Sequence, residues 1–413
     1  MLSLVFFISN TFGVLPMNFI AEKYGKRKIL IFCTFCMAFG SVIKQIACRP
    51  NLFWFAFIGQ TLVSFSYTCN YGSSVHITKS WFKQSEISKV VAILVFGMYF
   101  GSAMGFVIPP NVIAGIDDEA KIAFRLEVFM LIQTLISITL FILVLAFFKE
   151  DNHSILTVTN ECEFSFGFTL KSLGKNRNYL LLVISSSCVM GLFESQLTLL
   201  NHMILSVYPD SGQSVGTIGM LLMFSGCVSS LVMGYITDRF KSLRILYKVC
   251  NVLALSATTS YTLSYKFETV GLLYLTTTIM GFFLSSNSYL SLCVSYDITY
   301  PLSESVTSGV ILATNQLFGA LFSFVGTTMI ISFGTFVCNL IFVFIIVFVI
   351  TIDCFILHDE CESEHKLEAT PLLEQSKKLT DSKISIDMSS LFKFCKWNEQ
   401  RQHRFLDRSN SII

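Results

Sequence analysis

The sequence predicts an all-α membrane protein made of two pseudo-symmetric helical bundles, and three observations predict it. Hydrophobic residues make up 53% of the 413 residues and charged residues only 14%, whereas a soluble domain carries roughly 25% charged residues. Apolar runs long enough to cross a bilayer recur along most of the chain. A short charged segment at 22–28 returns at 238–241, each time between two apolar runs. Internal repeats of this kind are typical of secondary transporters.

The apolar runs set the expected helices, because a spanning helix needs about 20 mostly apolar residues. The runs that meet this length are 2–20, 29–47, 53–78, 90–114, 126–148, 179–205, 216–237, 245–264, 269–294, 306–331 and 334–357. The first run follows Met1 without basic residues and ends at a charged turn, so we interpret it as a transmembrane helix and not as a signal peptide.

The longest polar connection divides these eleven runs into five and six. We therefore expect four parts: an N-terminal bundle at 1–148, a cytoplasmic linker at 149–178, a C-terminal bundle at 179–357 and a largely disordered cytoplasmic tail at 358–413. The charged segment closes the first run of the front half but the second run of the back half. The front half is thus expected to lack its first helix, either through truncation or because one bundle is open on one side.

Lysine and arginine residues predict the orientation. The connections at 22–28, 79–89, 149–178, 238–248 and 295–305 together hold 15 of them, and the five alternate connections hold 4. The positive-inside rule places the first set on the cytoplasmic side, together with the C-terminal tail.

Composition excludes several other classes of protein. The net charge of +2 is too small to indicate nucleic-acid binding, and no basic patch is interleaved with aromatic residues. Cys33 and Cys36 lie three apart inside an apolar run without nearby histidine or cysteine partners, so we expect buried thiols and no metal site. The sequence holds no phosphate loop, zinc-protease pair or nucleophile elbow, so we expect neither an enzyme nor a cofactor.

The repeated charged segments indicate a conformational latch at the cytoplasmic side. A carboxylate there can accept hydrogen bonds from a neighbouring helix N-terminus and pair with a base, while a glycine allows a tight turn. The residues expected to form it are Glu22, Lys23, Gly25, Arg27, Asp238 and Arg239. The alternative interpretation is a plain positive-inside loop.

One helix carries glycines spaced four residues apart, Gly97, Gly101 and Gly105. Small residues at this spacing let two membrane helices approach closely, so we expect this glycine stripe to be a packing surface. Tyr99 lies about 200° around the helix from the stripe. We therefore expect Tyr99 to face a central cavity.

Glu194 is the most informative single residue, since it lies near the middle of the run 179–205. An acid at that depth is costly and normally faces a cavity. It could balance a cationic headgroup or couple transport to protons by titrating, and the alternative is a neutral acid bonded to another helix. Thr198 and Asn201 share its helix face.

Several separate motifs resemble a known family. They are Pro16 with Glu22, Gly25 and Arg27; Ser80-Trp81-Phe82; Gly97 to Gly105-Phe106 with Pro109-Pro110; Leu199-Leu200-Asn201-His202-Met203-Ile204-Leu205; Ile298-Thr299-Tyr300-Pro301-Leu302-Ser303-Glu304; Ser308-Gly309; and Gln316-Leu317-Phe318-Gly319. From 1 to about 357 the chain resembles the major facilitator superfamily and, more narrowly, its feline leukaemia virus subgroup C receptor-related family. This likeness leaves eleven of the usual twelve helices visible.

The resemblance implies a monomeric plasma-membrane transporter that takes up choline or ethanolamine by alternating access. Haem export is the alternative within the family, with His202 as a candidate ligand. A non-transporting membrane receptor or regulatory protein is the alternative from another class, because a five-plus-six arrangement leaves one bundle short of a helix that would help to seal it.

The resemblance also implies a substrate site around Gln316, which follows Asn315 and matches a glutamine that lines the site in the family. With it we group Glu194, Tyr99 and the neighbouring Phe193. The sequence departs from the family at three positions: Glu194 stands for a cavity tyrosine, Tyr99 for a glutamine, and Cys293 for an acid.

Overall fold

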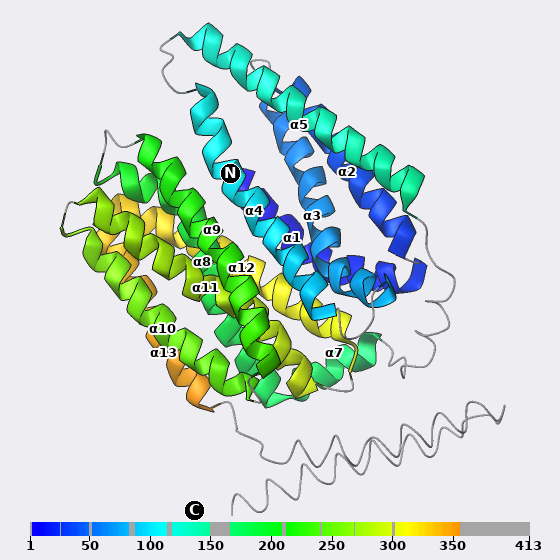
Figure 1. Cartoon of the computed structure of the whole chain (residues 1–413), viewed down its shortest axis with the longest axis vertical. Coiled ribbons are helices and arrows are strands. Elements are labelled where there is room, and N and C mark those ends of the chain that lie inside the picture. The colour runs from blue at the N-terminus through cyan, green and yellow to red at the C-terminus, as the bar shows by residue number, and fades with distance from the viewer. Residues whose placement is uncertain are drawn as a thin grey trace, which may run out of the picture. The chain divides into compact units, whose positions relative to one another are not determined.

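All elements that a computed structural model describes are helices, which confirms the predicted all-α class (Figure 1). The described residues are 2–24, 26–48, 52–81, 87–113, 118–148, 166–208, 212–239, 242–267, 269–299 and 302–355. They belong to one compact unit, Met1–Leu357.

The described helices follow the predicted runs closely. They are α1 (Leu2–Tyr24), α2 (Lys26–Ile46), α3 (Phe53–Trp81), α4 (Ile87–Ile113), α5 (Glu119–Phe147), α7 (Phe166–Lys175), α8 (Arg177–Leu205), α9 (Gly212–Arg239), α10 (Leu243–Ser264), α11 (Val270–Thr299), α12 (Glu304–Phe333) and α13 (Thr335–Phe355). All but α7 match an expected span. The short α7 lies inside the segment expected to be a polar linker.

Within the described residues, nine helices are long and apolar enough to cross a membrane. The sequence predicted eleven spans, and the two that fall short are α3 and α10. Both are rich in hydroxyl and amide side chains, and α10 begins near Arg244 and Lys248. Such residues lower the mean hydropathy of a helix without ending it.

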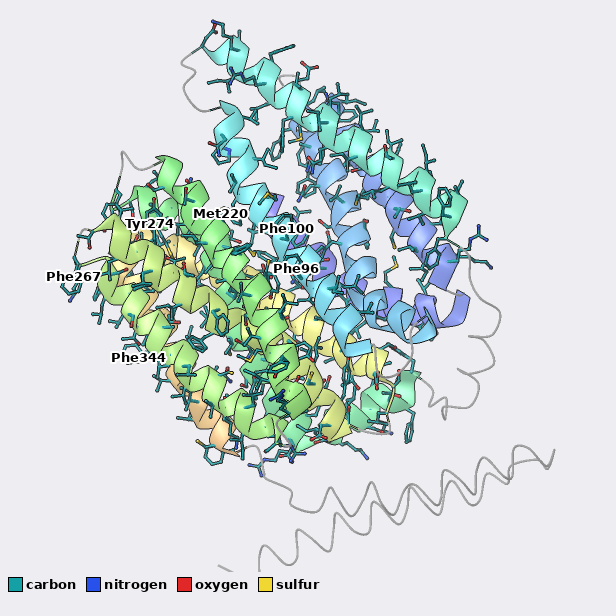
Figure 2. All side chains as sticks on the ribbon, in the orientation of Figure 1. Phe96, Phe100, Met220, Phe267, Tyr274 and Phe344 are labelled. Carbon is teal, nitrogen blue, oxygen red and sulfur yellow. The ribbon has the colours of Figure 1, made fainter. Side chains whose placement is uncertain are left out.

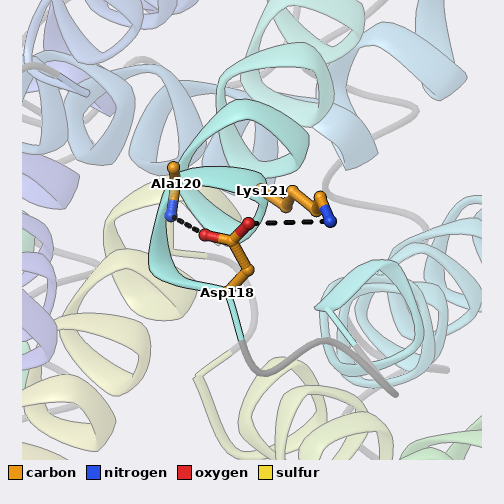
Figure 3. A network of polar contacts seen from close by, with 3 residues as sticks. All are labelled: Asp118, Ala120 and Lys121. Carbon is orange, nitrogen blue, oxygen red and sulfur yellow. Dashed lines mark hydrogen bonds and ion pairs between the residues drawn. The ribbon is translucent and has the colours of Figure 1, made fainter.

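Local chemistry sets several helix ends. Asp118 caps α5: its carboxylate accepts a hydrogen bond from the backbone N–H of Ala120 at 3.1 Å and lies 3.6 Å from the ammonium of Lys121 (Figure 3). Asn176 caps α8 in the same way, accepting from the N–H of Tyr179 at 3.1 Å. Gly334 adopts a φ of 85°, which allows the sharp turn between α12 and α13.

Two helix pairs make most of the contacts between the front helices α1–α5 and the back helices α8–α13, and α3 makes a smaller contact with α12. One pair is α1 with α12, and the other is α4 with α9, which run side by side in Figure 1. The largest buried cluster lies among the back helices and includes Tyr99 and Ala103 of α4. Elsewhere large apolar side chains cover the outside, such as Phe267 and Phe344 at 66% and 63% exposure (Figure 2). Such a surface suits lipid.

The glycine stripe does not pack as predicted. Gly97, Gly101 and Gly105 are exposed, and a Cβ added to any of them would meet nothing within 4 Å. Close approach of α4 to α9 instead uses glycines of α9. A Cβ at Gly216 would lie 2.9 Å from the backbone oxygen of Phe106, and one at Gly219 would overlap the Phe106 ring. Helical spacing predicted which residues share a face, but not what that face meets.

Candidate functional site

Glu194 lies where α1, α8 and α12 converge. A Cβ at Gly319 of α12 would lie 3.3 Å from the Cβ of Glu194 and 3.4 Å from the ring of Phe7 on α1. Glu194 is half-buried, whereas its neighbours Phe193 and Ser195 are fully buried. Within the described residues its carboxylate has no hydrogen-bond or ion-pair partner, while its backbone carbonyl accepts from Thr198 at 2.9 Å. An acid at membrane depth is thus left open to a ligand.

Gln316 lies on the same side of α12. It precedes Gly319 by three residues, so the two are neighbours on one helix face, and this face continues to Leu312, which packs against Val14 of α1. The side-chain oxygen Oε1 of Gln316 is buried and has no hydrogen-bond partner among the described residues. Gly319, three residues beyond Gln316, is thus the residue of α12 that approaches Glu194, and Oε1 of Gln316 remains an acceptor that no described residue satisfies.

Asn315 points elsewhere, although it is adjacent to Gln316. Its Oδ1 accepts a hydrogen bond from Ser187 of α8 at 3.2 Å, and the residue is 5% exposed. In this conformation Asn315 belongs to the contact between α8 and α12, not to the open site that the sequence analysis predicted for it.

Tyr99 and Phe193 meet each other instead of lining an open cavity. Their rings are 6.3 Å apart in an edge-to-face arrangement, and both are at most 4% exposed. The ring of Tyr99 also lies 3.2 Å from where a Cβ at Gly226 of α9 would be. The pair thus joins α4 to α8 and α9, and both rings are closed to solvent in this structure.

A row of aromatic contacts from the front helices ends beside Gly319, and the sequence did not predict it. The hydroxyl of Tyr67 on α3 donates to the sulfur of Met98 on α4 at 3.5 Å. The rings of Phe6 and Tyr67 are 5.0 Å apart, and those of Phe6 and Phe7 are 6.1 Å apart. Phe7 in turn contacts Gly319. Helical spacing alone does not single out these residues among 41 phenylalanines.

Most of the predicted latch lies outside what the structure describes: Gly25 and the side chains of Glu22, Lys23 and Asp238. Of the other two residues, Arg27 is half-buried. Arg239 places its guanidinium 4.6 Å from the centre of the Tyr235 ring on its own helix. The charged latch therefore stays a prediction.

A different contact joins the front and back helices at this end. Nδ2 of Asn18 on α1 donates to the backbone oxygen of Ser305 on α12 at 3.0 Å. A Cβ at Gly309 would lie 2.9 Å from the same Nδ2, so only glycine fits without a shift.

A buried polar network also escaped the sequence analysis. Asp353 of α13 is 2% exposed, and its carboxylate accepts from Ser185 of α8 at 2.6 Å and from Nδ2 of Asn251 on α10 at 2.7 Å. Asn287 of α11 donates to Asn251 at 3.0 Å, and Ser185 also bonds the hydroxyl of Tyr247 at 2.9 Å. This network ties four helices together. Because Asp353 is close to the end of an apolar run, its sequence position resembles that of an ordinary boundary charge.

Comparison with known proteins gives a consistent picture. A family model described as Major Facilitator Superfamily matches residues 1–297. An uncharacterised MFS-type transporter of Caenorhabditis elegans is 28% identical over 89% of this chain and 64% of its own length. The choline/ethanolamine transporters flvcr2b of Danio rerio and FLVCR2 of Homo sapiens are each 28% identical, over 82% and 78% of this chain and over 71% and 62% of their own lengths.

Solved structures show the same fold at low identity. The fucose:proton symporter FucP of E. coli has a TM-score of 0.63 at 13% identity, covering 86% of this chain and 90% of that one. The human organic anion transporter MFSD10 has a TM-score of 0.63 at 12% identity, covering 85% and 82%.

Proposed function

The chain belongs to the Major Facilitator Superfamily, and from that premise we propose that it carries a small cationic amine of the choline and ethanolamine class by alternating access. The match to the family model and the similarity to the choline/ethanolamine transporters confirm the family resemblance that the sequence predicted. The protein is a multi-pass integral membrane protein. We place it in the plasma membrane as a monomer, with its C-terminus in the cytoplasm.

The observation that carries the proposal is the unpartnered carboxylate of Glu194. A charge held at membrane depth is costly unless an opposite charge or polar groups satisfy it. A small ammonium ion would satisfy it, and the unused Oε1 of Gln316 would accept from an N–H or O–H of the same ligand. An ionised carboxylate only accepts hydrogen bonds and carries negative charge, so Glu194 favours a cation over an anion.

The aromatic row supports the same class of substrate. Phe7 lies next to Gly319, as Glu194 does, and Phe6 and Tyr67 continue behind it. Aromatic faces attract ammonium groups, with about 0.5–2 kcal/mol gained per contact. Similarity to transporters named for choline and ethanolamine agrees with this assignment.

The two helix pairs that join front and back helices supply the moving contacts. The Phe106 contact lies near the end of α4 and the Asn18 contact near the end of α1. Successive helices alternate in direction, so these contacts close opposite ends of the site. Alternating access requires breaking one while keeping the other.

Uptake of labelled choline and ethanolamine in transporter-deficient cells tests the proposal. We expect uptake with the wild-type chain and a loss of at least about tenfold, or ~1.4 kcal/mol, with Glu194→Gln. Glu127→Gln, which changes an exposed acid on α5, is the matched control and should not alter uptake. Equal uptake by both variants at equal surface expression would refute the role of Glu194. Absence of uptake together with altered cellular haem would favour haem export instead.

A further inference from the structure

The short helix α7 lies at the end of the bundle where α8 begins, beside the start of α12 (Figure 1). One of its faces is packed into the protein. Thr169 and Leu173 are buried, and Leu173 shares a cluster with Val306 of α12. At its start, the ring of Phe166 lies 5.3 Å from that of Phe19 on α1. The helix is therefore fixed to both sides of the contact between α1 and α12.

The opposite face of α7 is exposed and combines basic with large apolar side chains. Phe168 and Leu170 are 43% and 41% exposed. At 100° per residue, Lys171 and Lys175 lie between them on the exposed arc. Arg177 follows at the start of α8, and the stretch 166–178 contains no acidic residue.

We propose that this face of α7 binds the anionic phospholipid headgroups of the adjacent leaflet. The lysines would contact the phosphates while Phe168 and Leu170 enter the boundary with the acyl chains, as in interfacial amphipathic helices. A soluble phosphate compound would use the lysines but not the flanking apolar side chains. The predicted orientation puts α7 at the cytoplasmic leaflet, which carries the anionic lipids. Because α7 contacts Phe19 of α1 and Val306 of α12, bound lipids would also affect the contact between α1 and α12.

Lipid-dependent stabilisation of the purified full chain tests the proposal. Phosphatidylserine or phosphatidylcholine is titrated into the protein in neutral detergent, and the shift of the unfolding midpoint reports binding. We expect phosphatidylserine to stabilise the wild type more strongly than phosphatidylcholine does. Lys171→Gln/Lys175→Gln should bind phosphatidylserine roughly 30-fold more weakly, since each cation near an anionic surface contributes ~1 kcal/mol. High salt should weaken binding by the wild type.

The matched control neutralises two lysines at the opposite end of the helices. Lys121 is exposed at the start of α5, and Lys266 follows α10 with its ammonium over the ring of Phe336 at 4.4 Å. Lys121→Gln/Lys266→Gln should bind phosphatidylserine as the wild type does, and Lys171→Arg/Lys175→Arg should retain binding if the glutamine variant fails to fold. Unchanged affinity in the α7 glutamine variant, lost affinity in the arginine variant, or equal stabilisation by phosphatidylcholine or by soluble phosphoserine would overturn the proposal.

Discussion

Replacing Asp353 by alanine should destabilise the protein by about 3–5 kcal/mol. The carboxylate accepts two buried hydrogen bonds, of 2.6 Å from Ser185 and 2.7 Å from Asn251. Bonds to a charged group contribute ~1.5–3 kcal/mol each, and removing one partner of a buried set leaves the others unsatisfied. The two bonds together would contribute about 3–6 kcal/mol. We expect a loss in the lower part of this range because Ser185 keeps its hydrogen bond with Tyr247. Asp353→Asn should cost less, since Oδ1 remains an acceptor and only the bond to Asn251 is lost.

The unfolding free energies of the purified variants measure this effect, with Asp118→Ala as the control. Asp118 is an exposed helix cap with one backbone hydrogen bond and one surface ion pair (Figure 3). Its loss should cost only about 1 kcal/mol. If Asp353→Ala were no more destabilised than Asp118→Ala, the network would not hold the four helices together and the reasoning from buried hydrogen bonds would fail.

Three further changes test the helix contacts. Gly309→Ala should lower uptake several-fold at normal surface expression, because the new Cβ meets Nδ2 of Asn18 at 2.9 Å; unchanged uptake would mean that the contact yields freely. Gly101→Ala should leave the thermal midpoint unchanged or raise it, since the Cβ meets nothing and alanine favours helix by roughly 1 kcal/mol; a lowered midpoint would indicate that the glycine stripe packs after all. Tyr99→Ala should reduce both stability and uptake by opening a gap beside Phe193, while Tyr99→Phe, which keeps the ring, should lose less stability than Tyr99→Ala.

The helices were predictable because their signal lies in the sequence alone. An apolar run of membrane length forms a helix whatever the helix later packs against. The unusual cost of Glu194 at membrane depth was equally visible, whereas its convergence with Gln316 in one site stays a prediction. That convergence depended on the family resemblance for Gln316, not on spacing alone.

Side-chain environments could not be predicted in the same way. Helical spacing placed Tyr99 opposite the glycine stripe, yet it does not reveal that Phe193 would cover the tyrosine ring. The stripe itself could face a helix or lipid with the same spacing. Asp353 needs three other helices before its burial becomes apparent, and α7 is too short and too polar to be recognised among spanning runs.

The crossing of α8 and α12 at Gly191 restricts how the proposed site can change shape. A single methyl group there would come within 2.7 Å of Phe318 Cβ, so the two backbones are already in contact and cannot slide past one another. We therefore expect the acid on one helix and the amide on the other to move together. A bound cation would then keep the same coordination by α8 and α12 throughout the transport cycle. Its release would depend on the front helices moving away from these two.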